Sequence, residues 1–192
     1  MILTGNEILK QVNLNRIVIY PFNKTNLTTN SYDLTLGDKY LRYTSKILDP
    51  AKKAKYIIKK IPKSGLILHS GDFILGHSVE KIGSKKFVPI IHAKSSIARL
   101  GLFVHVTADL IDIGSIGNIT FQLYATLPIK IYPGMLIGQV SFWVPYGKVL
   151  LYNGKYQGSV GPKPSQAYKD FNQQNSTMSM TGGRSQPQAI ST

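Results

Sequence analysis

Hydrophobic and polar residues alternate in short segments along most of the chain, and Gly, Pro, Asp or Asn follows many of these segments. Alternation with a period of two is typical of half-buried strands, and frequent turns between strands indicate an all-β domain. The pattern therefore predicts a distorted β-barrel or jelly roll with one or two short helices. The predicted strands are Tyr32–Leu36, Phe73–Leu75, Phe87–Ile91, Ile119–Thr126, Ile129–Tyr132 and Leu136–Val144.

Helical signals occur at two places. Thr4 with Glu7 three residues later forms a capping box, and the apolar residues that follow have helical spacing, so we expect a helix over residues 4–13. A second short helix is expected over Ser95–Leu100, with Gly101 as its C-terminal stop.

The length of 192 residues suits one domain with a sizeable core. We expect this domain to cover residues 1–171. Residues 172–192 contain no aromatic residue and few charges, which predicts a flexible tail. No apolar run approaches the ~18 residues that span a bilayer, and the N-terminus lacks the pattern of a secretion signal. We therefore expect no membrane partner and a cytoplasmic location, or the host cytoplasm or virion if the gene is viral.

The net charge of +14 changes this picture, because 23 basic residues face only nine acids. Such a surface attracts polyanions, so an acidic partner, nucleic acid or a larger assembly is expected. A lysine-rich composition that follows from an AT-rich genome explains the charge equally well. The lysines at 52–63 surround Tyr56-Ile57-Ile58, and this pattern fits an exposed hairpin edge protected by charge at least as well as a binding site.

Cysteine is absent. This excludes disulfides, thiol nucleophiles and the Cys-ligated zinc site of the zinc-dependent nucleobase deaminases.

A set of motifs carries the candidate chemistry. In chain order these are Ser31-Tyr32-Asp33-Leu34, Phe73-Ile74-Leu75-Gly76, Lys94-Ser95-Ser96-Ile97-Ala98-Arg99, His105-Val106-Thr107-Ala108, Ile111-Asp112, Gln122, Pro133-Gly134-Met135-Leu136-Ile137-Gly138-Gln139 and Lys155-Tyr156-Gln157-Gly158. At these spacings the set resembles the dCTP deaminase branch of the dUTPase superfamily, including its bifunctional dCTP deaminase-dUTPase members. The resemblance covers about residues 1–171.

The resemblance implies a homotrimer of dUTPase-like (β-clip) barrels, with sites shared between subunits. It implies a deoxypyrimidine triphosphate ligand that carries Mg²⁺, with no direct metal ligand from the protein. The implied catalytic residues are Ser95, Arg99, Asp112 and Gln122. The implied nucleotide-binding residues are Lys94, Ser96, His105, Thr107, Ala108, Gln139, Lys155, Tyr156 and Gln157.

Taken singly, several of these residues have plainer interpretations. Ser95 and Arg99 also fit a helix cap and a solvated cation, and Asp112 fits a turn. His105 lies in an apolar run, where a packed histidine is common. Lys155 and Tyr156 also fit an ordinary strand.

Gln122 departs from the family, which carries a catalytic glutamate at this position. A carboxylate can take a proton from water and return it to a leaving group, whereas a primary amide cannot. No Asp or Glu occurs between Asp112 and Asp170 to replace it nearby. Ala93 and Ile113 also depart from the family pattern, and the aromatic residue usual after Gly114 is missing. Deamination is therefore expected to be lost.

Three hypotheses remain open: a triphosphate enzyme, more a dUTP pyrophosphatase than a dCTP deaminase; a module that senses nucleotides without turnover; and a trimer that serves as a structural component, for example of a virus particle. Whether the chain is an enzyme is left open at this point.

Overall fold

The fold consists of short strands in three sheets, with small helices at its ends. The computed structural model describes residues 1–173. In chain order the elements are α1 (Gly5–Asn13), β1 (Ile17–Tyr20), the 3-10 helix η1 (Lys24–Asn26), β2 (Tyr32–Thr35), β3 (Lys39–Tyr43), β4 (Tyr56–Lys60), β5 (Leu66–Leu68), β6 (Phe73–Ser84), β7 (Val88–Ala93), α2 (Ser95–Ala98), β8 (Leu102–Phe103), β9 (Ile116–Ala125), β10 (Ile129–Ile131) and β11 (Leu136–Trp143). Residues 167–173 are also helical. The predicted all-β class with short helices is confirmed.

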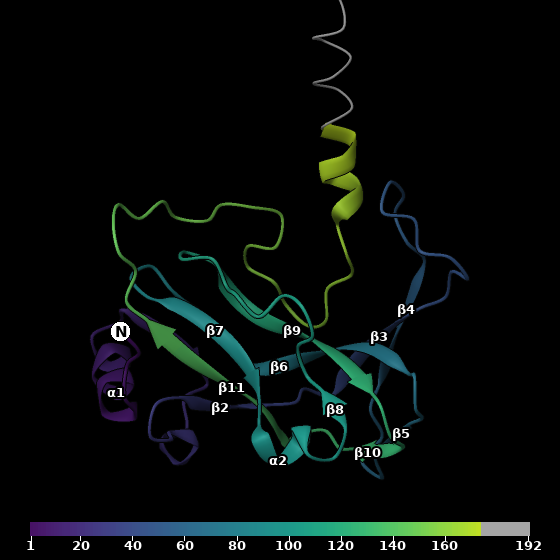
Figure 1. Ribbon diagram of the computed structural model, residues 1–192, viewed down its shortest axis with the longest axis horizontal. Helices are drawn as coiled ribbons and strands as arrows, with labels where there is room; N and C mark the ends of the chain where they lie inside the picture. The colour runs from purple at the N-terminus through teal and green to yellow at the C-terminus, as the bar shows by residue number, and fades with distance from the viewer. Residues whose placement is uncertain (174–192) are drawn as a thin grey trace, which may run out of the picture.

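The largest sheet has the strand order β4-β3-β6-β9-β8, with β1 paired to β6. A second sheet has the order β2-β11-β7, and β10 pairs with β5. Figure 1 shows β7 and β11 crossing the molecule beside β6 and β9, with α1 near one end and β4 at the other. Buried side chains from both larger sheets share one core, which includes Leu34, Phe121, Val140 and Phe142.

The two predicted helices are present. Thr4 caps α1 by accepting a hydrogen bond from the Glu7 backbone N–H at 3.4 Å. The Glu7 side chain does not return the bond, because it accepts one from Gln11 instead. The second helix is shorter than expected: α2 ends at Ala98, and Gly101 follows with a φ of +78°.

One predicted strand end is wrong. Phe73–Leu75 was expected to stop at Gly76, yet β6 continues to Ser84. A Cβ on Gly76 would lie 3.1 Å from side-chain atoms of both Leu36 and Leu123. The glycine is therefore a place of close packing within the strand, and the absence of a side chain there was misread as a turn.

Strand β9 provides the platform for the site. Its residues alternate between the core and a more open face, with Phe121 and Leu123 fully buried and Gln122 partly exposed between them. The long pairing of β9 with β6, in which Leu75 lies opposite Gln122, fixes where these side chains point.

The lysine-rich segment forms the expected hairpin edge. β4 pairs with β3 alone among the described strands, and all five of its residues are exposed.

Within residues 1–173, no helix is long and apolar enough to cross a bilayer. The predicted tail falls outside the described residues from position 174 onward, and its first two residues belong to the 167–173 helix.

Candidate functional site

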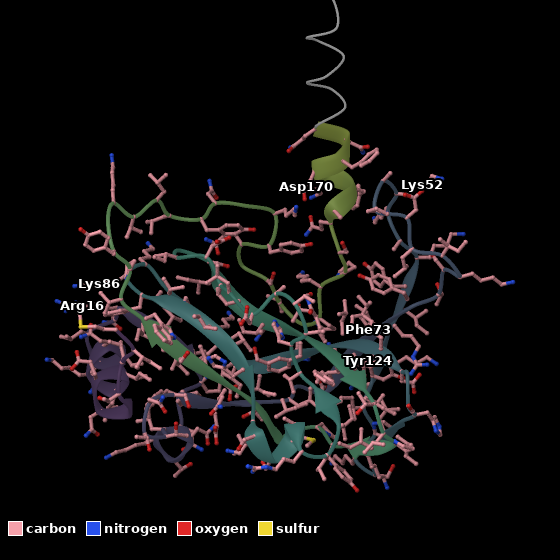
Figure 2. The ribbon with its side chains drawn as sticks, in the orientation of Figure 1. Arg16, Lys52, Phe73, Lys86, Tyr124 and Asp170 are labelled. Atoms are coloured by element: carbon pink, nitrogen blue, oxygen red, sulfur yellow. The ribbon has the colours of Figure 1, made fainter. Side chains whose placement is uncertain are left out.

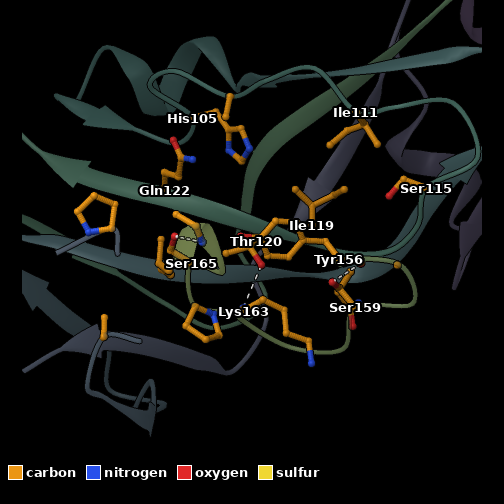
Figure 3. A pocket seen from close by; sticks show the side chains of 18 of the residues that line it. His105, Ile111, Ser115, Ile119, Thr120, Gln122, Tyr156, Ser159, Lys163 and Ser165 are labelled. Atoms are coloured by element: carbon orange, nitrogen blue, oxygen red, sulfur yellow. Dashed lines mark hydrogen bonds between the residues drawn. The ribbon is translucent and has the colours of Figure 1, made fainter. Parts of the chain in front are cut away.

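A cavity of about 610 Å³ lies over the open face of β9 and β6. Its floor includes Leu75, Thr120 and Gln122, and its walls come from residues 105–112, from the β3–β4 connection and from the segment 152–168. Figure 3 shows side chains from these segments converging on the cavity. Segments that are distant in sequence thus enclose one volume of the size of a small-molecule site.

Gln122 lies on the floor of this cavity with a free side chain. Its backbone N–H donates to the Val104 carbonyl at 2.9 Å, which fixes the position of the residue. Its side-chain amide has no hydrogen-bond partner among residues 1–173. One donor and one acceptor group are therefore available to a molecule in the cavity.

His105 lines the cavity close to Gln122 (Figure 3). Its Nδ1 lies 2.9 Å from the Val104 carbonyl, and its ring packs edge-on against Phe121 at 6.2 Å. Because a carbonyl can only accept, Nδ1 carries the proton and Nε2 is the free acceptor of the neutral ring. Burial lowers the pKa of His105, so this neutral form prevails at pH 7.

Two carboxylates line the cavity, Asp112 and Asp49. Asp112 was expected, whereas Asp49 was missed because it lies 73 positions before Gln122, at the tip of another hairpin. Asp49 accepts a hydrogen bond from the Ala51 backbone N–H at 2.9 Å and lies 3.3 Å from the Lys52 ammonium. The Ala51 hydrogen bond and then Lys52 lower the pKa of the Asp49 carboxyl, which makes it a weak base.

Glu80 is an acid outside the cavity lining, and its hydrogen bonds give it a structural role. Glu80 is 3% exposed. Its carboxylate accepts hydrogen bonds from the Thr35 backbone N–H at 3.0 Å and from the Thr35 hydroxyl at 2.7 Å.

The segment 152–168 forms the roof of the cavity, and Tyr156 lines it. The Tyr156 hydroxyl accepts a hydrogen bond from the Gln166 backbone N–H at 2.8 Å. Gln157 points the other way: its side chain donates to the Gly114 carbonyl and accepts from the Ile116 N–H, each at 2.8 Å. Gln157 thus anchors the roof to the start of β9.

Lys155 forms an ion pair with Asp170 from the helix 167–173. This hydrogen bond raises the pKa of the Lys155 ammonium.

Several of the residues predicted to be catalytic or to bind the nucleotide lie elsewhere in the chain. Ser95, Ser96 and Arg99 are exposed on and beside α2, and none of them lines the cavity. Figure 1 shows α2 at the far end of β7 from the roof segment. Thr107 is also exposed and outside the cavity lining, although its neighbour Ala108 belongs to it.

Lys94 and Gln139 belong to a separate interior cluster. The Lys94 ammonium pairs with Asp33, whose side chain is only 7% exposed. Gln139 accepts from the Ser31 hydroxyl at 3.0 Å and donates to the Ala93 carbonyl at 3.4 Å. In this structure both side chains therefore connect β2, β7 and β11.

Comparison with known proteins places these features in a family. The model of dCTP deaminase-like domains matches residues 2–144. The chain belongs to the dCTP deaminase-like family. It is 42% identical over 172 residues to a dCTP deaminase, dUMP-forming, of Clostridium beijerinckii, covering 89% of this chain and 99% of the relative. It is 44% identical over 175 residues to the enzyme of the same description from Clostridium botulinum (strain Eklund 17B / Type B), with the same two coverages.

A solved structure supports the fold. The 2'-deoxycytidine 5'-triphosphate deaminase of Agrobacterium tumefaciens superposes with a TM-score of 0.60 at 20% identity. The match covers 75% of this chain and 48% of that one, so this chain spans about half the length of that protein.

Within this family member, the cavity collects five of the predicted site residues: His105, Ala108, Asp112, Gln122 and Tyr156. It leaves out Lys94, Ser95, Ser96, Arg99, Thr107, Gln139, Lys155 and Gln157. The sequence reasoning missed the lining residues Tyr43, Asp49, Lys52, Thr120 and Lys163. The alternation of β9 does signal Thr120, which lies two positions before Gln122 on the same face.

Proposed function

We propose that the cavity binds a deoxypyrimidine nucleoside triphosphate with its base against Gln122, and that the chain hydrolyses dUTP to dUMP and pyrophosphate without deaminating dCTP. The free amide of Gln122 on the cavity floor carries this proposal. An amide can donate to uracil O4 while accepting from N3–H, whereas a carboxylate can only accept. The two Clostridium relatives are described as dCTP deaminases that form dUMP, which supports the ligand class.

Two polar groups that line the cavity, Gln122 and Asp49, support the proposed loss of deamination. Water attack at cytosine C4 needs a group that removes a proton and returns it to the leaving ammonia. Gln122 cannot do this, and Asp49 is held as a weak base by Ala51 and Lys52. Asp112 is the remaining carboxylate of the lining.

Phosphate hydrolysis does not require a side chain that shuttles a proton to a leaving ammonia. It needs a water molecule aligned with the phosphorus atom and positive charge around the phosphate oxygens. We assign alignment of the water to Asp112. The triphosphate would be held by Ser95, Ser96 and Arg99 of a second copy in a homotrimer, because α2 lies outside the cavity of its own chain.

A bound triphosphate would carry Mg²⁺ on its own phosphate oxygens, as hard oxygen ligands suit this ion. Mg²⁺ would supply charge neutralisation at the phosphates. No group of three or more His, Asp or Glu side chains in residues 1–173 forms a cage of its own for a metal.

The direct test incubates the purified chain with Mg²⁺ and either dCTP or dUTP, and measures ammonia and pyrophosphate separately. The proposal requires pyrophosphate from dUTP, no ammonia from dCTP, and loss of turnover in Asp112→Asn and in Arg99→Gln. Mixing these two variants should restore part of the activity if sites are shared between copies. Ammonia release from dCTP by the unmodified chain would refute the proposal.

A non-catalytic role is the second candidate, favoured by Gln122 together with the net charge of +14. In this role the trimer would be a nucleotide sensor or a structural component. If neither nucleotide turns over, calorimetric titration with dUTP and dTTP separates the two: binding identifies a sensor, and absence of binding leaves the structural role.

A further inference from the structure

The β3–β4 hairpin, residues 39–63, concentrates the positive charge of the chain. It contains nine basic residues and one acid, a net charge of +8 out of the +14 of the whole protein. All eight of its lysines are exposed. Among the described residues only Lys52 of these lysines forms an ion pair, with Asp49. The charge is therefore segregated at one end of the molecule and largely unpaired (Figure 2, near Lys52).

The arrangement of these lysines exceeds what protection of an edge strand requires. Edge protection relies on charged side chains of the edge strand itself, and only Lys59 and Lys60 of the eight lysines lie on β4. Here Lys39 and Lys60 are direct cross-strand partners, and like charges placed opposite each other destabilise a sheet. Because the free protein bears this repulsion, the charges are better explained by a polyanion that relieves it.

Aromatic side chains accompany the lysines on one face. Tyr56 of β4 lies directly opposite Tyr43 of β3. The pairing of Leu41 with Leu75, extended by two residues, places Tyr43 beside Phe73 of β6. Tyr56 and Phe73 are 37% and 42% exposed. A row of rings thus crosses three strands from the lysine-rich edge to the cavity, which Tyr43 and Phe73 line.

We propose that the β3–β4 hairpin binds single-stranded nucleic acid, with its lysines on the phosphates and Tyr56 stacked on a base. Basic residues that follow the backbone, combined with exposed rings for stacking, are what single-strand binding requires. The aromatic row can stack with the exposed bases of a single strand. A duplex hides its bases from such stacking, and the hairpin contains no helix that could enter the major groove. The hairpin adjoins the cavity through Tyr43 and Lys52, whereas Tyr56, Lys39 and Lys60 lie outside the cavity lining and can be changed without altering it.

The test is fluorescence anisotropy with a labelled 20-nucleotide oligo-dT and a duplex of the same length, between 50 and 200 mM salt. With about five phosphate contacts, the single-strand affinity should fall roughly 100-fold over this range, since each contact contributes about 0.7 to the log–log slope. The triple variant Lys39→Gln, Lys55→Gln, Lys60→Gln should make the slope shallower by about 2.

A matched variant removes the same charge elsewhere. Lys85, Lys86 and Lys148 are exposed outside the hairpin, and Figure 2 shows Lys86 at the opposite end of the molecule from Lys52. Replacing these three by Gln should leave the slope nearly unchanged. Tyr56→Ala should weaken oligo-dT binding at least about 5-fold, and Tyr56→Phe should retain it.

Three outcomes would overturn the proposal. The two triple variants could lower the slope equally, which would mean that net charge alone attracts the oligonucleotide. The duplex could bind as tightly as oligo-dT with no effect of Tyr56→Ala. Finally, the hairpin variant could change the oligomeric state in size-exclusion chromatography with light scattering, which would identify the hairpin as an interface between copies.

Discussion

Replacing Gln122 by Glu is the sharpest probe of the site, and we expect it to create dCTP deamination. The two side chains have nearly the same shape, and the amide of Gln122 has no partner within residues 1–173 that the change would break. The Val104 carbonyl that receives the Gln122 backbone N–H is untouched, so the new carboxylate should occupy the position of the amide. The apolar floor around Leu75 should raise the pKa of this carboxyl, which suits a group that must both accept and return a proton.

The size of the gain follows from the role of the group. General acid–base catalysis contributes about 10²–10⁴-fold, which is about 3–5 kcal/mol of transition-state stabilisation. We therefore expect ammonia release from dCTP to rise at least about 100-fold over the unmodified chain.

The assay follows ammonia from dCTP and separates the nucleotides by ion-exchange chromatography. Gln122→Asp is the matched control. It adds the same charge, but its side chain is one methylene shorter and ends farther from the base, so ammonia release should rise far less. Gln122→Met tests whether loss of the amide alone has an effect. If Gln122→Glu binds dCTP yet releases no ammonia, then the missing carboxylate does not explain the loss of deamination, and the changes at Ala93 and Ile113 must contribute.

Three further outcomes are expected. Lys94→Met should lower the free energy of unfolding by about 3 kcal/mol in urea titrations, because it leaves the carboxylate of Asp33 buried and unpaired. Burial lowers the pKa of His105 in the folded chain, so near pH 6.5 and below the unfolded chain binds more protons than the folded chain does. The free energy of unfolding should therefore fall as the pH drops from 7.5 to 5.5. His105→Gln should flatten this pH dependence in thermal melts. Gln157→Ala removes two hydrogen bonds to the chain around Gly114, and it should speed amide exchange at residues 114–116 and weaken nucleotide binding. Unchanged exchange there would show that other contacts hold the roof.

The sequence predicted β9 and α1 well because local patterns determine them. Alternation predicted a strand over Ile119–Thr126, which β9 (Ile116–Ala125) confirms, and Thr4 marked the start of α1. Gly76 failed as a turn signal because the reason for the glycine is tertiary: Leu36 and Leu123 occupy the space that a side chain would need.

The site was only partly predictable, for the same reason. Asp49 reaches the cavity from a hairpin tip, and no local signal connects it with Gln122. The resemblance that implied Lys94 as a nucleotide-binding residue could not show that the buried carboxylate of Asp33 lies beside it.

The hydrogen bonds that hold the roof segment affect how many substitutions the cavity can tolerate. Several of its attachments run through peptide groups: the Gly158 N–H donates to the Ile116 carbonyl at 3.0 Å, and the Asn118 N–H donates to the Ser159 carbonyl at 2.8 Å. Peptide groups survive almost any substitution, so these two attachments persist whichever side chains the roof and β9 carry. A cavity built in this way can exchange one reaction for another while its shape persists, which makes the chain a suitable scaffold for directed evolution of new pyrimidine chemistry.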